Sequence, residues 1–183
     1  MKPKAREVRQ TLLCTLADGE FHSGETLAQT LGLSRTAIAG HISQLTDWGL
    51  DVFKVKGKGY KLNRPLILLD EQTIGQQITM PHKGNIRVAQ VIESTNTELK
   101  DAASQRANGD VILAEIQTAG RGRHGRQWLA PVGGSLTMSM YWRFNDGYQS
   151  MAGLSLLVGI AVCQALKQCG LDEARLKWPN DVL

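Results

Sequence analysis

The chain has 183 residues, of which 42% are hydrophobic and 21% are charged, a composition that is typical of a folded globular protein and excludes a disordered or fibrous one. The most apolar segment, residues 151–163, is shorter than the roughly 20 residues of a membrane-spanning helix, and no segment has the pattern of a secretory signal. The formal net charge is +4. Residues 1–64 hold ten Lys or Arg and six Asp or Glu, whereas residues 65–183 hold eleven of each, so the positive excess indicates a polyanionic partner for the N-terminal third.

Three short helices are predicted before residue 48. The first stops at the turn Asp18–Gly19, the second covers Gly24–Leu31, and the third follows Ser34, a natural N-cap. Each helix has apolar residues three or four apart on one side, as a helix that packs on a core requires. These apolar residues are Val8, Leu12, Leu16, Leu27, Leu31, Ile38, Ile42 and Leu45.

A β-hairpin is predicted next, because the apolar period changes from helical to alternating. Phe53 and Val55 are expected on one face and Lys54 opposite them. After a turn at residues 57–59, the return strand is expected to place Tyr60 and Leu62 on the apolar face, with Lys61 on the outer side. The sequence Asn63-Arg64-Pro65 breaks this pattern, so we predict one domain at 1–64 and another at 65–183.

The first 64 residues are typical of a winged helix-turn-helix, whose last helix enters the major groove of DNA. Arg35, near the start of that helix, is the best candidate to donate to a guanine edge. Gly40 in its middle costs about 1 kcal/mol relative to Ala, and either admits the DNA backbone or leaves the helix soft. The hairpin lysines, Lys61 included, fit a wing on backbone phosphates, but they also fit a hairpin that is merely kept soluble. The candidate DNA-binding residues are Ser34, Arg35, Thr36, His41, Gln44, Lys54, Lys56 and Lys58.

The rest of the chain mixes strands and helices, which gives an α+β fold class. The whole chain has three cysteines, Cys14, Cys163 and Cys169, and their spacing is not that of metal ligands. We therefore expect them to be buried, reduced thiols of a cytoplasmic protein. Helices are predicted at 70–78, 95–103 and 151–169, strands at 86–92, 111–117, 136–144 and 174–178, and a long loop at 118–134.

Three segments carry candidate chemistry. Gly120–Trp128, with the sequence GRGRHGRQW, combines glycines that let the backbone approach a ligand with arginines that bind phosphate or carboxylate. Arginine–glycine runs also occur in nucleic-acid-binding tails. Glu93–Asn96 (ESTN) lies between a strand and a helix, where Thr95 to Glu98 also forms a capping box. Lys177–Asp181 (KWPND) is, taken alone, a turn.

In this order and spacing, ESTN, QTAGRGRHGRQW and KWPND, preceded by a winged helix, resemble the bifunctional biotin protein ligases. The resemblance implies a winged helix-turn-helix domain followed by the N-terminal part of a mixed-sheet ligase domain like that of class II synthetases. It also implies that biotin is activated with ATP and Mg²⁺ and passed to the biotin carboxyl carrier protein of acetyl-CoA carboxylase. A homodimer would repress the biotin operon by binding operator DNA, with biotinyl-adenylate as corepressor. Family members extend past the WPND motif, so we expect this chain to lack part of the catalytic domain.

Residue roles follow from the resemblance. Arg121 and Arg123 would be catalytic, facing the biotin carboxylate and the α-phosphate. Joining these two anions needs fixed positive charge but no side-chain nucleophile, and a glycine-rich loop is expected to order over the ligand and exclude water. Two alternatives stay open: a biotin-sensing DNA-binding regulator without ligase activity, and a ligase for lipoate. The residues implied for biotin are Ser94, Thr95, Asn96, Gln117, Gly120, Arg121 and Arg123, and for ATP and adenylate Gly122, Gly125, Arg126, Trp128, Asn180 and Asp181, with Mg²⁺ near Asp181.

Overall fold

The computed structural model describes residues 4–79, 81, 83–122, 126–128, 130–145, 147–178 and 181–183. It divides into two compact units, residues 1–142 and 143–183, which we describe separately. The domain boundary that the sequence predicts at residues 64–65 stays a prediction. Within the described residues, no helix has the length and apolar character needed to cross a membrane.

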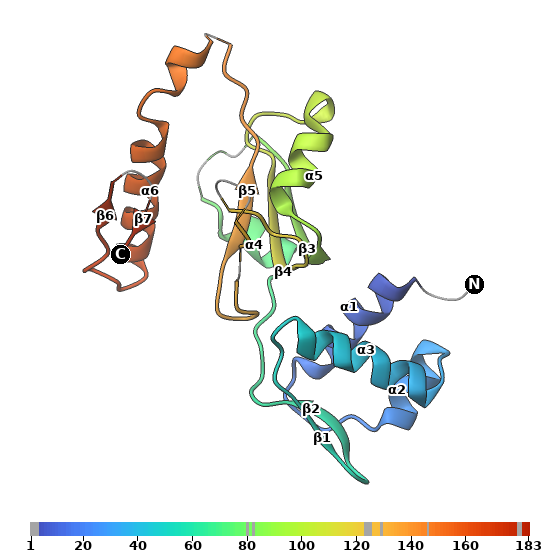
Figure 1. The fold of residues 1–183 in the computed structure, drawn as a ribbon. Helices are drawn as coiled ribbons and strands as arrows, with labels where there is room; N and C mark the ends of the chain where they lie inside the picture. Colours follow the sequence, from blue (N-terminus) through green and yellow to red (C-terminus); the bar gives the residue numbers. More distant parts are fainter. Residues whose placement is uncertain are drawn as a thin grey trace. The chain divides into compact units, whose positions relative to one another are not determined.

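Residues 4–62 contain three helices and a hairpin, as predicted: α1 (Ala5–Leu16), α2 (Gly24–Leu31), α3 (Arg35–Asp47), β1 (Val52–Val55) and β2 (Gly59–Leu62) (Figure 1). Ser34 caps α3 by accepting a hydrogen bond from the backbone N–H of Ala37, and Gly32 ends α2 with a φ of +63°. The apolar sides of the helices meet in a shared core, where Leu12, Leu16 and Ile38 are fully buried. Burying one such side chain stabilises the fold by roughly 1.5–3 kcal/mol.

The hairpin differs from the prediction in which residues share a face. Lys54 lies opposite Tyr60, and Phe53 lies opposite Lys61. Directly opposed residues of an antiparallel pair point to the same face, so Lys54 is on the face of the buried Tyr60 and Leu62. The sequence assigned the apolar face of β1 by hydrophobicity alone. The core instead takes Val52, and Phe53 and Val55 are exposed.

A short extended segment lies beside β2. His22 and Tyr60 exchange two backbone hydrogen bonds, each 2.9 Å long, so residue 22 adds a third strand position to the hairpin. The backbones are close at Gly59, where a Cβ atom would stand 2.0 Å from the carbonyl oxygen of His22. Gly59 also has a φ of +107°, a conformation that favours glycine. The glycine therefore allows the His22 segment to lie against the hairpin.

A three-stranded mixed sheet follows in the same unit. β3 (Ile86–Ile92) pairs in parallel with β4 (Val111–Gln117), which pairs antiparallel with β5 (Thr137–Met140). α5 (Thr95–Asp101) and a 3₁₀ turn, η1 (Ala103–Gln105), connect β3 to β4, and α5 packs on one face of the sheet (Figure 1). The bounds of β3 and β4 are those predicted. β5 is shorter than the predicted 136–144, because its regular pairing with β4 ends at Val111 and Met140, beyond which Tyr141 makes backbone hydrogen bonds to Gly109 and Asp110.

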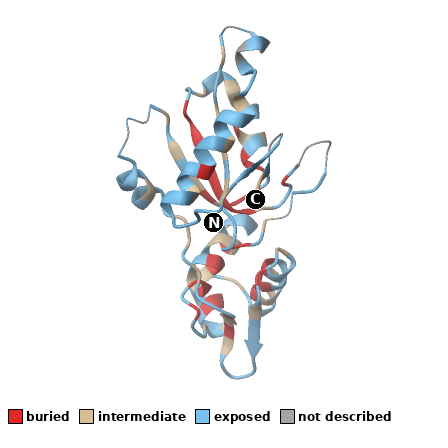
Figure 2. Ribbon diagram, turned by 90° about the vertical axis from the view of Figure 1, so that its left-hand side faces the viewer, coloured by how far each residue is buried: buried red, intermediate tan, exposed pale blue. Residues whose placement is uncertain are grey.

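One hydrophobic cluster joins the sheet to the winged helix within this unit. Val91, Ile116 and Val132 belong to the cluster of buried residues that contains Leu12 and Leu16. Figure 2 shows buried residues, coloured red, in the winged helix and in the sheet. The connecting segment is hydrogen-bonded to both parts. The N–H of Leu66 donates to the carbonyl of Ala17 at 2.8 Å, and the N–H of Leu69 donates to the buried carboxylate of Glu115. A short helix, α4 (Glu71–Gln77), follows this segment.

The second unit contains a 3₁₀ turn, η3 (Tyr148–Met151), α6 (Leu154–Gln168), β6 (Leu176–Lys177) and β7 (Asp181–Val182). α6 begins three residues later than predicted, because Gly153 has a φ of +80° and interrupts the helical path. The antiparallel pair β6–β7 places Lys177 opposite Asp181, and the sequence predicted only the first of these strands.

The cysteine prediction was only partly correct. All three thiols are free and Cys163 is buried, but Cys14 and Cys169 are exposed. Cys14 lies off the apolar stripe of α1, and Cys169 is the C-cap residue of α6, so neither position faces a core.

Candidate functional sites

A pocket of about 240 Å³ opens where the end of β4, the start of β5 and the start of α5 meet. It joins segments that are far apart in the sequence, including the ESTN motif, the last residue of β4 and both flanks of the glycine–arginine segment. Five of the seven residues predicted for biotin, all but Gly120 and Arg123, line it. The lining residues are Ser94, Thr95, Asn96, Gln117, Arg121, Trp128, Leu136, Thr137, Met138 and Ser139.

The pocket floor is a partly buried hydrogen-bond network centred on Thr95, which is itself 2% exposed. Its backbone N–H and its hydroxyl both donate to Oε1 of Gln117, at 2.8 and 3.1 Å, and its Oγ1 is 2.8 Å from Oγ of Ser139. A backbone N–H is always a donor, so the Gln117 amide must present its oxygen to Thr95. Thr95 has a single hydroxyl proton, which Gln117 receives, so Ser139 must donate to Thr95.

This network leaves defined polar groups for a ligand. Nε2 of Gln117 has two protons and faces Gly120, where a Cβ atom would stand 2.9 Å from it. The oxygen of Ser139 keeps lone pairs after donating its proton. The floor therefore presents an amide donor and a hydroxyl acceptor side by side.

Ser94 caps α5 by accepting a hydrogen bond from the N–H of Thr97 at 3.3 Å. The sequence placed the cap one residue later, in a capping box from Thr95 to Glu98. That box does not form, because the Thr95 hydroxyl donates to Gln117 and Glu98 pairs with Arg87. Thr95 is thereby available to the pocket.

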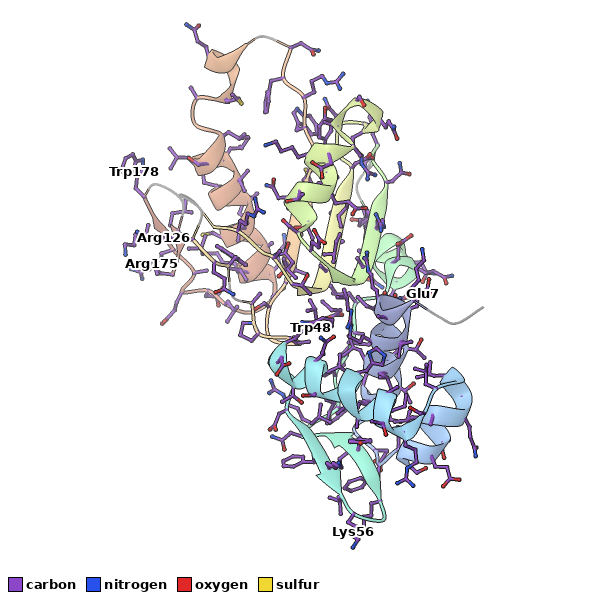
Figure 3. The ribbon with its side chains drawn as sticks, turned by 45° about the vertical axis from the view of Figure 1, so that its right-hand side comes forward. Glu7, Trp48, Lys56, Arg126, Arg175 and Trp178 are labelled. Atoms are coloured by element: carbon purple, nitrogen blue, oxygen red, sulfur yellow. The ribbon has the colours of Figure 1, made fainter. Side chains whose placement is uncertain are left out.

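The two flanks of the glycine–arginine segment, residues 120–122 and 126–128, pair with each other, where the sequence predicted a loop. We call these paired flanks the glycine–arginine hairpin. The N–H of Gly122 donates to the carbonyl of Arg126 at 2.7 Å, and the N–H of Trp128 donates to the carbonyl of Gly120 at 3.0 Å. Arg121 and Gln127 therefore lie opposite each other as an antiparallel backbone pair. The packing at Gly120 is tight, because a Cβ atom there would stand 3.1 Å from the backbone oxygen of Trp128, so a larger residue would need a small shift of the paired backbone. The Trp128 side chain is 56% exposed, and Arg126 is exposed (Figure 3). Arg123 and Gly125, both predicted site residues, lie outside the described residues.

The predicted nucleotide residues near the C-terminus belong to the second unit. Asp181 is exposed in β7, and Asn180 lies outside the described residues. Within the part of the chain that the structure describes, no three His, Cys, Asp or Glu side chains gather as a metal site.

Four of the predicted DNA-binding residues lie around one groove of about 850 Å³ between α3 and the β1–β2 hairpin: Arg35, Thr36, Lys54 and Lys56. Lys56 extends from the far tip of the hairpin (Figure 3). Ser34 is used as the α3 cap. A Cβ atom on Gly40 would meet nothing within 4 Å, so α3 is open on that side.

His41 and Gln44 lie near Arg9 of α1. Nη1 of Arg9 donates to the Gln44 side chain, and its guanidinium stands 5.1 Å from the centroid of the Trp48 ring. Burial, together with the Arg9 charge, lowers the pKa of His41, which favours the neutral imidazole at pH 7. Their DNA-binding role stays a prediction, and the structure gives Gln44 a hydrogen bond inside the winged helix.

Sequence reasoning missed the contribution of β5 to the pocket. Leu136 to Ser139 all line it, and Ser139 completes the Thr95 network. The signal was present in the alternation of Thr137 and Ser139 with methionines, which puts hydroxyls on one face of a strand next to the ESTN motif.

Two family models match the chain. The model of the biotin/lipoate A/B protein ligase family matches residues 88–183, and a model described as an HTH domain matches residues 8–61. The HTH match covers the segment from α1 to β2, and the ligase match begins in β3 and continues through the second unit.

Several proteins of known name are similar over nearly the whole chain. The bifunctional ligase/repressor BirA of Salmonella typhimurium is 50% identical over 98% of this chain and 55% of its own length. BirA of Escherichia coli is 48% identical over the same shares. A solved biotin protein ligase from Aquifex aeolicus, in complex with biotin and ATP, is 35% identical over 54% of this chain and 40% of that one, with a TM-score of 0.46. The chain spans about half the length of the curated relatives it matches.

Proposed function

The chain belongs to the biotin/lipoate A/B protein ligase family, and from that membership we propose that the whole protein is a biotin protein ligase that also represses transcription. In this proposal it forms biotinyl-5′-AMP from biotin and ATP, transfers biotin to a lysine of the biotin carboxyl carrier protein, and binds operator DNA with the adenylate as corepressor. The carrying observation is the pocket in which the ESTN motif, Gln117 and the glycine–arginine hairpin meet. The similarity to two bifunctional ligase/repressors supports the second activity.

Recognition of the biotin head group is assigned to the pocket floor. A cyclic urea carries a carbonyl acceptor and two N–H donors. The Gln117 amide is suited to donate to the carbonyl, and the Ser139 hydroxyl is suited to accept from an N–H. Because Thr95 fixes both groups by hydrogen bonds before any ligand arrives, little conformational entropy remains to be lost on binding.

Arg121 is assigned to the carboxylate and phosphate side of the reaction, with Arg123 beside it in the sequence. The carboxylate attacks the α-phosphorus of ATP, a C–O–P mixed anhydride forms, and pyrophosphate leaves. Arginine cations offset the repulsion between the two anions and stabilise charge on the phosphoryl oxygens. The hairpin that carries Arg121 also carries Trp128, which we assign to packing near the adenine. Its closure would keep water from the anhydride.

ATP and magnesium are assigned to the nucleotide side, with Gly122, Gly125, Arg126, Asn180 and Asp181 as the residues implied by family resemblance. We propose that magnesium enters as the ATP complex, held mainly by phosphate oxygens, as Mg²⁺ is in many nucleotide sites. Asp181 would contribute a single carboxylate at most.

The DNA-binding role is assigned to the groove between α3 and the hairpin. Arg35 and Thr36 stand at the start of α3, where the side chains of a recognition helix meet base edges, and Lys54 and Lys56 stand across the groove. The operator-bound form is proposed to be a homodimer, as the resemblance implies.

Biotin-dependent exchange of labelled pyrophosphate into ATP tests the enzyme, in this chain and in a version extended to the length of its relatives. Exchange by the extended version supports the proposal. Biotin binding without exchange in that version would favour a biotin-sensing regulator without ligase activity. The family model also covers lipoate ligases, so calorimetric titration with biotin and with lipoate must accompany the exchange assay. Tighter binding of lipoate than of biotin would overturn the assignment of biotin as the substrate.

A further inference from the structure

The outer face of the hairpin carries an exposed group of apolar and cationic side chains. Phe21, Phe53 and Val55 are 37%, 45% and 40% exposed, although aromatic and branched aliphatic side chains usually pack inside. The exposed Lys58 and the half-buried Lys61 accompany them. We call these five residues the outer face.

The backbone register explains why these residues gather. His22 pairs with Tyr60 in antiparallel fashion, so Phe21 falls opposite Lys61 on the neighbouring strand. Lys61 in turn lies opposite Phe53 of β1. The row Phe21, Lys61, Phe53 therefore crosses three strand positions on one face, next to Val55.

Two lysines converge on a single aromatic ring. The ammonium nitrogens of Lys58 and Lys61 stand 5.6 and 5.3 Å from the centroid of the Phe21 ring. A cation over an aromatic face gains about 0.5–1 kcal/mol at an exposed site. Within the described residues the side-chain ion pairs are His22–Asp18 and Arg87–Glu98, so neither lysine is neutralised by a carboxylate.

The opposite face of the hairpin has a different cation. The ammonium nitrogen of Lys54 stands 5.8 Å from the Tyr60 ring centroid, and both residues line the groove toward α3 together with Arg35. The hairpin thus presents cations on both faces, one set toward the recognition helix and one set away from it.

We infer that the outer face is a second surface for the DNA backbone, on which Phe21 acts as a positioning residue for Lys58 and Lys61. This inference rests on the proposed DNA-binding function. Two unpaired cations held at one ring fit a partner with closely spaced anions, and DNA phosphates meet that requirement. The exposed Phe53 and Val55 beside them suit the apolar edges of deoxyribose. Phe21 lies in neither the recognition helix nor the hairpin strands, so a DNA role for it does not follow from the winged-helix pattern.

The test is a double-mutant cycle on DNA affinity, measured by fluorescence anisotropy with a labelled duplex of random sequence over a range of salt concentrations. We expect Phe21→Leu to weaken binding about five- to thirtyfold, as two cation–π contacts of this size predict. Phe21→Tyr, which keeps the aromatic face, should bind like the unaltered chain. Lys58→Gln with Lys61→Gln should lower the slope of log K against log salt by about 1.8. In that background, Phe21→Leu should have no further effect.

Three outcomes would overturn the inference while leaving the DNA role in place. These are unaltered affinity of Phe21→Leu, equal weakening by Phe21→Tyr, and an undiminished effect of Phe21→Leu in the lysine-free background, which would mark a purely structural residue. Lys54→Gln is the matched control on the inner face, and its effect should add to that of Phe21→Leu. Thermal unfolding midpoints of all variants check that the fold is retained. Failure of the unaltered chain to bind any DNA would remove the DNA role itself, and with it this inference.

Discussion

The two candidate sites of the first unit are built on opposite physical principles. The pocket floor is made of neutral groups that are hydrogen-bonded to one another: the buried Thr95 and the half-buried Gln117 and Ser139. The winged-helix surface is made of exposed cations such as Arg35 and Lys56. A buried polar group is costly to leave unpaired, whereas an exposed charge interacts weakly and is screened by salt. We therefore expect few, large and salt-insensitive contributions in the pocket, and many, small and salt-sensitive ones on the DNA surface.

The largest effect is expected from Gln117→Leu. This change removes the acceptor of two Thr95 hydrogen bonds and the amide proposed for the biotin carbonyl, at a cost of about 2–3 kcal/mol. Biotin affinity should fall roughly 30- to 150-fold in calorimetric titrations. The loss should be the same at low and high salt. A strongly salt-dependent loss would contradict the division between the two sites.

Arg121→Gln should have an effect of about 1–3 kcal/mol, because one charge-assisted interaction is lost while the hairpin base is kept. The expected result is faster escape of biotinyl-adenylate, measured by chasing labelled adenylate from the extended protein. Gln127→Ala, a change at the paired position across the hairpin, is the control for hairpin geometry. If Arg121→Gln retains adenylate as the unaltered protein does, the assignment of the hairpin to the reaction fails.

Arg35→Ala should weaken binding to a specific operator by about 1–3 kcal/mol and binding to random DNA by less. The operator can be selected from a random library with the extended protein. Equal losses on both DNAs would show that Arg35 contacts phosphate and not base edges. Lys56→Gln, on the other side of the groove, is expected to weaken both DNAs equally and to lower the salt slope by about 1.

The smallest effect is a pH dependence of stability. The backbone N–H groups of Asn85 and Ala107 both donate to the Asp110 carboxylate. These hydrogen bonds, that of Asn85 above all, and the charge of Arg106 lower the pKa of the Asp110 carboxyl. A carboxyl with a lowered pKa stabilises the fold above its unfolded pKa of about 3.9, and the contribution is lost as the pH falls through the folded pKa. Unfolding by urea at pH 7 and near pH 3 should therefore show a smaller acid-induced loss for Asp110→Asn. An identical pH dependence in the variant would contradict this. Ligand binding by the neutral pocket floor should not share it.

Local patterns predicted the elements well, because each depends on neighbouring residues. The helix bounds around Ser34 follow from a cap and an apolar stripe, and β3 and β4 follow from short segments rich in valine and isoleucine. The face on which a strand residue lies and the residue at which a strand ends were harder to predict. Lys54 lies on the inner face because its register is set by Tyr60, and β5 stops at Met140 because β4 begins opposite it. Both depend on a partner strand that the local pattern does not specify.

The candidate site was predictable only in part, for the same reason. Ser94, Thr95, Gln117 and Arg121 were found through motifs, and the pocket brings them together. Ser139 was not found, because its role depends on the single proton of the Thr95 hydroxyl and on a strand pairing. The hairpin base at Arg121 was missed because glycine and arginine favour loops by composition, while the pairing comes from backbone groups that composition does not show.

The contact at Gly59 has a consequence for how this chain tolerates sequence change. No L-amino-acid side chain fits between the hairpin and the His22 carbonyl, so in a saturation library selected for DNA binding, codon 59 should be nearly invariant. Gly57, with a φ of +83° and empty space around it, should admit asparagine or aspartate. The two glycines of this turn would then tolerate substitution differently, because neighbouring atoms constrain Gly59 whereas only the backbone torsion constrains Gly57.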